Sequence, residues 1–365
     1  MAARQNKDQP IAFITGVSGQ DGSYLAELLL SKSYIVHGMI RKRVANDQMG
    51  LIIESLRAHW PSQFHLHYGD ITDAGRMLDL VSTIRPSEIY NLAALSHVSL
   101  SFQMPSTALK VNAVDTVNLL QSVTLLQLEK TKYYQASSSE MFGNAEAEVQ
   151  NEETRFDPVS PYAVAKLAAH LAVKSSREKG MYAVAGVLFN HESPRRGRSF
   201  VTRRITIKVA EISLGLADTL VIANLDTKRD WGHARDYVQA MWCMLQQARP
   251  TDFIIATGTS HSVREFIEAA FEVVRIKIRW VGNGAKEKGF AVTENNTLSR
   301  MPVVVVDPSV EAMRSSKVQN LRGDASKARR LLFWRPNTSF GELVAEMVQG
   351  DVEILRKAKG TVTKL

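Results

Sequence analysis

The chain has 365 residues, of which 45% are hydrophobic and 22% are charged, with a formal net charge of +8. This composition excludes disordered, collagen-like and low-complexity chains. There is no apolar run of about 18 residues and the start, MAARQNKDQP, is polar, so we expect neither a membrane span nor a secretion signal. The single cysteine, Cys243, cannot form an internal disulfide or a metal cluster. We therefore expect a cytoplasmic enzyme or binding protein.

Basic residues gather in short groups rather than in one long run. The groups are Arg41–Arg43, Arg195–Arg198, Arg203–Arg204 and Lys327–Arg330. A basic chain predicts an anionic partner, and separate groups favour several discrete phosphates. No aromatic residues punctuate a basic stripe, so we predict no nucleic-acid partner. The alternative is a set of solvated faces, which we favour for the last group.

Apolar strands alternate with helices through the first half of the chain. The expected strands are Ile11–Thr15, Ile35–Ile40, Phe64–Tyr68, Glu88–Leu92, Tyr133–Ser137 and Ala183–Phe189, and the expected helices are Ser23–Ser31, Met77–Ile84, Thr107–Leu128 and Ala163–Lys179. This alternation is typical of a parallel sheet covered by helices on both faces. The predicted fold is therefore an α/β, doubly wound, Rossmann-like parallel sheet.

The pattern becomes less regular after Asn190, which predicts a smaller C-terminal substrate-binding lobe. We expect residues 1–190 to form the nucleotide-binding domain, with 225–260 returning to it, and 191–224 with 261–365 to form the lobe. Within the returning part, Asp236–Leu245 and Asp252–Thr257 are predicted as a helix and a strand. Lys286–Arg300 is polar and is predicted as a surface loop.

A glycine-rich turn joins the first strand to the first helix. Gly16, Gly19 and Gly22 follow a G-x-x-G-x-x-G spacing, which lets backbone N–H groups approach a pyrophosphate at a helix N-terminus. The alternative is a purely structural turn. The second strand ends at Arg41, where an acidic residue would hold the ribose of NAD, so a cation there favours the 2′-phosphate of NADP. Asp70, after the third strand, could accept a bond from the adenine amino group.

Tyr162 and Lys166 are four residues apart on a predicted helix, so they share one face. An ammonium beside a phenol favours the phenolate, and we expect it to lower the pKa of Tyr162. Ser138 and Glu140 follow a strand at the sheet edge where ligands bind in open α/β folds. On an extended chain, residues two apart point the same way, and we interpret this group as catalytic. Taken alone, Glu140 could be an exposed loop acid.

These stretches together resemble the extended short-chain dehydrogenase/reductase superfamily, and within it the GDP-mannose 4,6-dehydratases. The matching segments are TGVSGQDGSYLAELLL (15–30), LHYGDITD (66–73), EIYNLAALSHVSLSF (88–102), YQASSSEMFG (134–143), SPYAVAKL (160–167), LFNHESPRRG (188–197), FVTRRI (200–205), LDTKRDWGHARDYVQAMW (225–242) and ATGTSHSVREF (256–266). The resemblance runs from about Ile11 to Glu353, and NHESPRRG and KRDWGHARDYV are its most specific parts.

The resemblance implies a role for each matching residue. Tyr162 would be the base at the sugar 4-hydroxyl, with Lys166 as its partner; Glu140 would be the acid/base at C5 and C6, and Ser138 would bond the substrate near O4. NADP would contact Gly16, Gly19, Gln20, Asp21, Gly22, Arg41, Asp70, Leu92, Tyr162, Lys166, His191 and Arg196. The GDP-mannose substrate would contact Asn190, Arg204, Arg229 and Arg314. The family also implies a homo-oligomer, either a dimer or a tetramer.

The chain departs from the family pattern at a few positions. Ser138 replaces Thr and Arg204 replaces Lys, which keeps the hydroxyl and the cation. Leu95 replaces Gln, Lys317 replaces Glu, and the loop after Arg41 reads KRVAND, not the family's Ser-rich sequence.

Two other function classes remain to be compared with the dehydratase. A 4-keto reductase or an epimerase of the same superfamily is the alternative enzyme, although Glu140 argues against a plain epimerase. A non-catalytic NADP-binding protein is opposed by the complete catalytic group. Three histidines, His97, His191 and His233, are too widely separated in sequence to predict a metal site, and we expect no metal.

Overall fold

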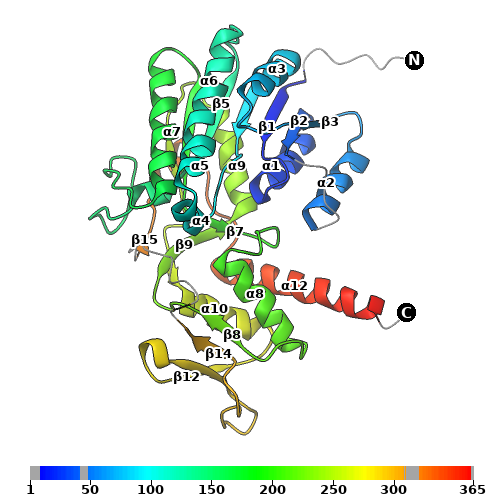
Figure 1. Ribbon diagram of the computed structural model, residues 1–365, viewed down its shortest axis with the longest axis vertical. Helices are drawn as coiled ribbons and strands as arrows, with labels where there is room; N and C mark the ends of the chain where they lie inside the picture. Colours follow the sequence, from blue (N-terminus) through cyan, green and yellow to red (C-terminus); the bar gives the residue numbers. More distant parts are fainter. Residues whose placement is uncertain (1–8, 42–47, 308, 310–319, 363–365) are drawn as a thin grey trace.

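The computed structural model describes residues 9–41, 48–307, 309 and 320–362. A larger part, built on a parallel sheet, lies above a smaller part that contains two further sheets (Figure 1). The predicted α/β, doubly wound architecture is confirmed. Arg314, Lys317 and the segment 42–47 lie outside the described residues.

Seven parallel strands form the large sheet in the order β10-β6-β5-β4-β1-β2-β3. The strands are β1 (Ile11–Thr15), β2 (Ile35–Ile40), β3 (Phe64–Tyr68), β4 (Glu88–Asn91), β5 (Lys132–Ser138), β6 (Ala183–Leu188) and β10 (Phe253–Ile255). All six residues of β6 are buried, as expected for an inner strand that is covered on both faces. The strand order reverses direction between β1 and β4, and dinucleotides bind in the crevice at such a point.

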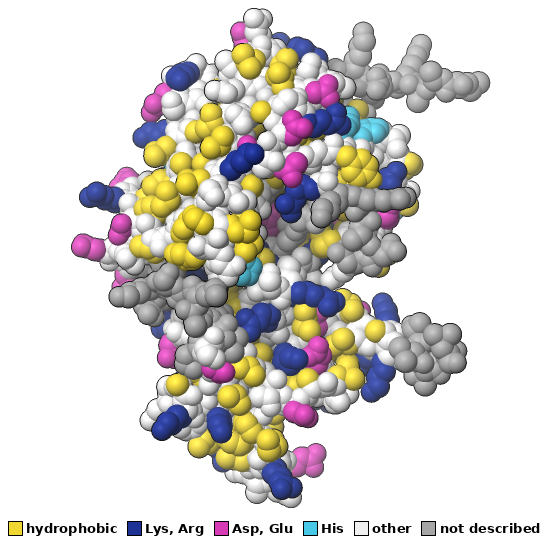
Figure 2. Space-filling view, in the orientation of Figure 1, with side chains coloured by type: hydrophobic (Ala, Val, Ile, Leu, Met, Phe, Trp, Pro, Cys, Tyr) yellow, Lys and Arg dark blue, Asp and Glu magenta, His cyan; other side chains and the backbone are white. Residues whose placement is uncertain are grey.

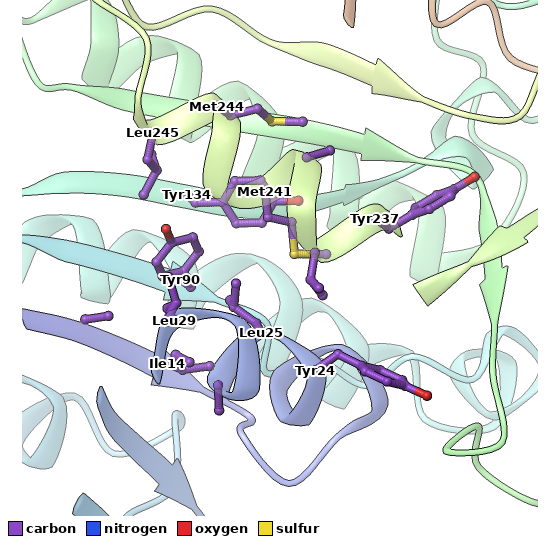
Figure 3. Packing of buried hydrophobic residues seen from close by; sticks show 14 of the residues in the cluster. Ile14, Tyr24, Leu25, Leu29, Tyr90, Tyr134, Tyr237, Met241, Met244 and Leu245 are labelled. Atoms are coloured by element: carbon purple, nitrogen blue, oxygen red, sulfur yellow. The ribbon is translucent and has the colours of Figure 1, made fainter. Parts of the chain in front are cut away.

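Helices cover both faces of this sheet. On one face lie α1 (Gln20–Ser31), α2 (Gln48–His59), α9 (Ala234–Leu245) and α11 (Ser326–Leu331), and on the other lie α3 (Ala74–Ile84), α6 (Asp115–Leu125) and α7 (Pro161–Glu178). The first face is closed by Leu25 and Leu29 of α1 packing beside Met241 and Met244 of α9 over Tyr134 (Figure 3). This packing holds the N-terminus of α1 rigidly at the carboxyl edge of the sheet.

Two smaller sheets build the rest of the molecule. One contains β7 (Asn190–Glu192), β9 (Lys228–His233), β11 (Ser260–Ser262) and β15 (Asn320–Leu321), and the other contains β8 (Leu220–Ile222), β12 (Ile278–Val281), β13 (Lys288–Ala291) and β14 (Val304–Val306). Helices α8 (Val201–Ser213), α10 (Val263–Val273) and α12 (Phe340–Val362) pack with β8 and β14 around a second apolar core. Strand β7 follows β6 almost directly, so it carries the chain from the large sheet to the smaller ones.

Two predicted segments differ from the structure. The helix expected over Thr107–Leu128 is divided into α5 (Pro105–Leu109), the π-helical turn η1 (Lys110–Val114) and α6. The expected loop Lys286–Arg300 contains β13, which pairs with β12 and β14. The strand was not predicted because its sequence is polar, and a strand can be polar where one face of its sheet is open to solvent. Three short helices complete the chain: α4 (Val98–Gln103) and the 3₁₀ turns η2 (Ser139–Phe142) and η3 (Gly284–Lys286).

Candidate active site

The turn between β1 and α1 has no room for side chains at two of its glycines. Gly16 has φ +72°, and a Cβ there would lie 3.0 Å from the backbone nitrogen of Ala93. A Cβ on Gly22 would lie 2.3 Å from the carbonyl oxygen of Gly16. The turn is closed by the N–H of Gly19, which donates to that same oxygen at 2.9 Å. This is the tight backbone cradle that a dinucleotide pyrophosphate requires.

Hydrogen bonds join the ends of β1 and β4 at the crevice. The Thr15 hydroxyl donates to Asn91 Oδ1 at 2.7 Å and accepts from the N–H groups of Leu92 and Ala93, each at 3.1 Å. The loop beyond is held by Asn112 of η1, which accepts from the Leu95 N–H and donates to the Leu95 carbonyl. The π-helical turn thus shapes the crevice wall, as such turns frequently do at functional sites.

Arg41 and Asp70 lie at the ends of β2 and β3, along the same edge of the sheet. Arg41 is exposed. Asp70 Oδ1 accepts from the N–H of Thr72 at 2.9 Å and from its hydroxyl at 2.8 Å. The Thr72 N–H is the main reason that the pKa of Asp70 is lowered, and the charge of Arg41 contributes. Arg41 therefore lies close enough to Asp70 for its charge to act on this carboxylate.

Helix α7 carries Tyr162 in its first turn and Lys166 one turn later. The helix begins where the Ser160 side chain accepts from the N–H of Ala163 at 3.1 Å. Both Tyr162 and Lys166 are buried. The Lys166 ammonium lies 5.8 Å from the centroid of the Tyr162 ring and donates to the carbonyl of Ala136 at 2.8 Å.

The pKa of Tyr162 moves in the direction opposite to the one we expected. Burial raises the pKa of Tyr162 to about 12. The hydrogen bond with the Ser138 hydroxyl, which favours the phenolate, opposes this increase only in part. The charge of Glu140 adds to the increase. Burial lowers the pKa of Lys166 to about 8. The prediction from spacing was wrong because desolvation of the phenol outweighs its charged and hydrogen-bonding neighbours.

Ser138 and Glu140 lie where β5 passes into the turn η2. Ser138 is the N-cap, and its hydroxyl accepts from the N–H of Glu140 at 3.2 Å. Glu140 therefore stands in a 3₁₀ turn, not on extended chain as expected. Its Oε1 lies 3.8 Å from Nη2 of Arg229, which comes from β9 in a different sheet. Both side chains are largely buried, at 13% and 15% exposed.

One cleft brings most of the predicted residues together. Its walls include Asp21, Leu92, Ser138, Glu140, Tyr162, Lys166, Asn190, His191, Arg196 and Arg229. Other predicted residues do not line it: Gly16, Gly19, Gln20 and Gly22 around the start of α1, Arg41 and Asp70 after β2 and β3, and Arg204 on α8. No group of three His, Cys, Asp or Glu side chains in the described part of the chain could hold a metal ion.

Asp21 and His191 form a buried pair at the base of the cleft. His191 Nε2 lies 2.8 Å from Asp21 Oδ2, and its Nδ1 lies 2.8 Å from the Phe189 carbonyl. Burial opposes the charge of the imidazole, but Asp21 prevails and raises the pKa of His191. Gln20 donates to the His191 carbonyl at 3.0 Å and accepts from Ser193 at 2.8 Å. These bonds join the start of α1 to β7 and the residue after it.

Several arginines of the basic groups are tied to acidic partners. Arg195 pairs with Glu27 at 2.7 Å, and the fully buried Arg203 pairs with Asp351 at 2.6 Å. These two ion pairs join separate parts of the chain: Arg195 on the loop after β7 to α1, and Arg203 on α8 to α12. We did not predict Glu192, although it lines the cleft. It is buried, accepts from the Thr202 hydroxyl at 2.7 Å and lies 2.9 Å from Arg196. Its position inside the stretch NHESPRRG is the signal that could have identified it.

A doubly wound sheet, a tight glycine turn and a Tyr-x-x-x-Lys pair beside it define a short-chain dehydrogenase/reductase fold. Comparisons with known proteins give the particular family: the family model described as GDP-mannose 4,6 dehydratase matches residues 13–347. The chain belongs to the GDP-mannose 4,6-dehydratase family.

Relatives of that name share almost the full length of the chain. The GDP-mannose 4,6-dehydratase of Sinorhizobium fredii is 48% identical over 352 residues, covering 96% of this chain and 98% of that one. The human GDP-mannose 4,6 dehydratase is 45% identical over 354 residues, covering 96% and 93%.

Solved structures share the fold at lower identity. A Thermotoga maritima UDP-glucose 4-epimerase with UDP-glucose has a TM-score of 0.75 at 20% identity, covering 94% of this chain and 99% of that one. The structure of RMD from Pseudomonas aeruginosa complexed with NADPH has a TM-score of 0.71 at 22% identity, covering 94% and 100%. Among the helices of the described residues, none has the length and apolar character to cross a bilayer.

Proposed function

We propose that this protein converts GDP-mannose to GDP-4-keto-6-deoxymannose, with NADP as its cofactor. The observation that carries the proposal is the cleft in which Ser138, Glu140, Tyr162 and Lys166 meet beside the glycine turn. Membership of a family whose relatives bear the name of this activity supports the same substrate. The sequence division into a nucleotide-binding domain (1–190, with 225–260) and a substrate lobe (191–224 and 261–365) is part of this proposal.

The residues at the nucleotide end fit NADP. Gly16 and Gly22 leave space that a Cβ would fill, and Gly19 closes the turn. Arg41 offers a cation for the 2′-phosphate, which supports NADP over NAD. A bound NADP would supply reversible hydride transfer, from C4 of the sugar and back to C6. Gln20, Asp21, Asp70, Leu92, His191 and Arg196 complete the proposed site.

The cleft residues divide the proton transfers between them. Tyr162 receives the proton of the 4-hydroxyl, and the Ser138 hydroxyl bonds near O4 and favours the phenolate. Lys166 lies one turn behind Tyr162 and supplies positive charge. A 4-keto group acidifies the C5 proton, so Glu140 can take that proton and then pass it to the departing 6-hydroxyl, which leaves as water. Hydride addition at C6 then requires a proton at C5, and the proton that Tyr162 received from the 4-hydroxyl balances this step.

Cations around the cleft suit a nucleoside diphosphate. Arg229 lines the cleft beside Asn190, and its planar guanidinium matches phosphate geometry. Arg204 lies on α8 and, with Arg314 outside the described residues, extends the proposed GDP contacts.

We also infer that the protein is a cytoplasmic homo-oligomer, with a second copy on the outer face of α4–α7. The exposed apolar side chains of α4 to α7 and the turns between them are Leu100, Met104, Leu109, Val114, Val117, Leu125, Val164 and Leu171. Figure 2 shows apolar side chains gathered over this region.

The variant Leu171→Glu tests this interface because it places a charge among these apolar side chains. It should be a monomer by light scattering. Leu216→Glu, at another exposed leucine, is the control.

Glu140→Gln tests the proposed reaction by separating its two halves. The amide of this variant cannot accept the C5 proton, and general acid–base catalysis typically contributes about 10²–10⁴-fold. On adding GDP-mannose, the variant should accumulate reduced cofactor, seen by absorbance, without exchange of deuterium into C5. Tyr162→Phe should leave the cofactor oxidised. Normal turnover by the Glu140→Gln variant would refute this role of Glu140. Failure of the wild type to reduce its cofactor on GDP-mannose would favour a 4-keto reductase or an epimerase.

A further inference from the structure

The cations of the cleft differ in their partners. Arg196 lies 2.9 Å from Glu192, His191 lies 2.8 Å from Asp21, and the Lys166 ammonium donates to a backbone carbonyl. Among the described residues, Arg229 is the cation that forms an ion pair with Glu140. This pair joins the proposed C5 base to a residue proposed for the substrate's diphosphate.

The contact between Arg229 and Glu140 is long enough for Arg229 to exchange Glu140 for another anionic partner. The separation of 3.8 Å exceeds that of a charge-assisted hydrogen bond. Arg229 is anchored independently of Glu140, because its Nη1 donates to the Lys228 carbonyl at 2.8 Å. Glu140 is anchored through its backbone N–H on Ser138. Each side chain can therefore release the other without leaving the cleft.

Two charges at this distance still act on each other appreciably. In water, opposite unit charges about 4 Å apart change a binding equilibrium by roughly five- to tenfold, and by more in a partly buried cleft. The other titratable groups facing Glu140 are Tyr162, whose pKa it raises, and Asp21, which acts on Tyr162 from the base of the cleft.

We propose that Arg229 is a positioning residue shared between Glu140 and the diphosphate of the substrate. Before substrate binds, the guanidinium lies against the Glu140 carboxylate. The diphosphate then takes the guanidinium, which leaves the carboxylate available for the C5 proton. In that step the C–H bond breaks, its electron pair remains on the sugar as the enolate of the 4-ketone, and the proton passes to the carboxylate. This inference rests on the proposed function.

A binding cycle with GDP tests the exchange without turnover. If Glu140 and the diphosphate compete for Arg229, Glu140→Gln should tighten GDP binding by about five- to tenfold in calorimetry. In an Arg229→Gln background the same change should have no effect. In an Arg204→Gln background, which removes another proposed GDP contact, the gain should persist. An equal gain from Glu140→Gln with and without Arg229 would overturn the proposal.

The two proposals fail separately. If no 4-keto product forms, the proposed function is wrong, and the GDP cycle still reports on the ion pair. If product forms but Glu140→Gln tightens GDP binding equally with and without Arg229, Arg229 binds substrate only and the present inference is wrong.

Discussion

A buried carboxylate at the start of α6 should make the protein less stable at neutral pH than in mild acid. Asp115 is fully buried, and its Oδ2 has no hydrogen-bond partner among the described residues. Burial raises its pKa to about 6 from 3.8; Lys110 opposes this shift and Asp70 adds to it. Replacing the carboxylate by an amide, Asp115→Asn, removes the charge with little change of shape.

The size of the effect follows from linkage. The pKa of the Asp115 carboxyl is near 4 in the unfolded chain and about 6 in the folded protein. The folded protein is therefore most stable, with respect to this group, below about pH 4. It loses that stability as the pH rises through about 6. Two pKa units correspond to about 3 kcal/mol at full burial. We therefore expect Asp115→Asn to increase the free energy of unfolding by about 1–3 kcal/mol at pH 7.5 and by about a third as much at pH 4.5.

Urea denaturation of both proteins at several pH values between 4.5 and 8 would measure this difference. The matched control is Asp79→Asn, which removes an exposed carboxylate paired with Arg76 on α3 and should change the free energy of unfolding by less than about 1 kcal/mol at any pH. A stability gain from Asp115→Asn that does not depend on pH would refute the reasoning, because the gain would then not come from a titrating charge.

Three further predictions concern the cofactor end and the core. Gly22→Ala should abolish NADP binding in calorimetry, since its Cβ would lie 2.3 Å from the Gly16 carbonyl oxygen; binding at wild-type affinity would show that the turn can relax. Arg41→Asp should shift the affinity preference from NADP towards NAD, and an unchanged ratio would remove Arg41 from the 2′-phosphate site. Arg203→Leu should cost about 3–5 kcal/mol in urea denaturation because it leaves Asp351 buried and unpaired, and adding Asp351→Leu should recover much of that loss.

The large sheet could be predicted because its signals are local. Each strand of the first half is a short apolar run bounded by polar turns, and the observed ends differ by a residue or so from those expected. The glycine turn and the Tyr-x-x-x-Lys pair also lie within single segments. The division of the Thr107–Leu128 helix by η1 could not be predicted, because it depends on Asn112 bonding to the distant loop at Leu95.

The roles of individual charged residues could not be predicted either, because they also depend on contacts between distant parts of the chain. Arg203 and Arg204 are adjacent, yet Arg203 is buried against Asp351, 148 residues later in the chain. Only the packing of α8 on α12 distinguishes the two arginines. The raised pKa of Tyr162 likewise depends on how deeply its ring is buried, which spacing on a helix does not report.

The cleft depends on a joint between two sheets. Glu140 follows β5 of the large sheet, whereas Arg229 lies on β9 of a smaller one. The residue after Arg229, Asp230, is fully buried and accepts from the N–H and hydroxyl of Thr257 and from the N–H groups of Gly258 and Gly323. Thr257 and Gly258 directly follow β10, an edge strand of the large sheet. Asp230 therefore ties β9 to the end of the sheet that carries Glu140, and this contact helps to hold Arg229 near Glu140.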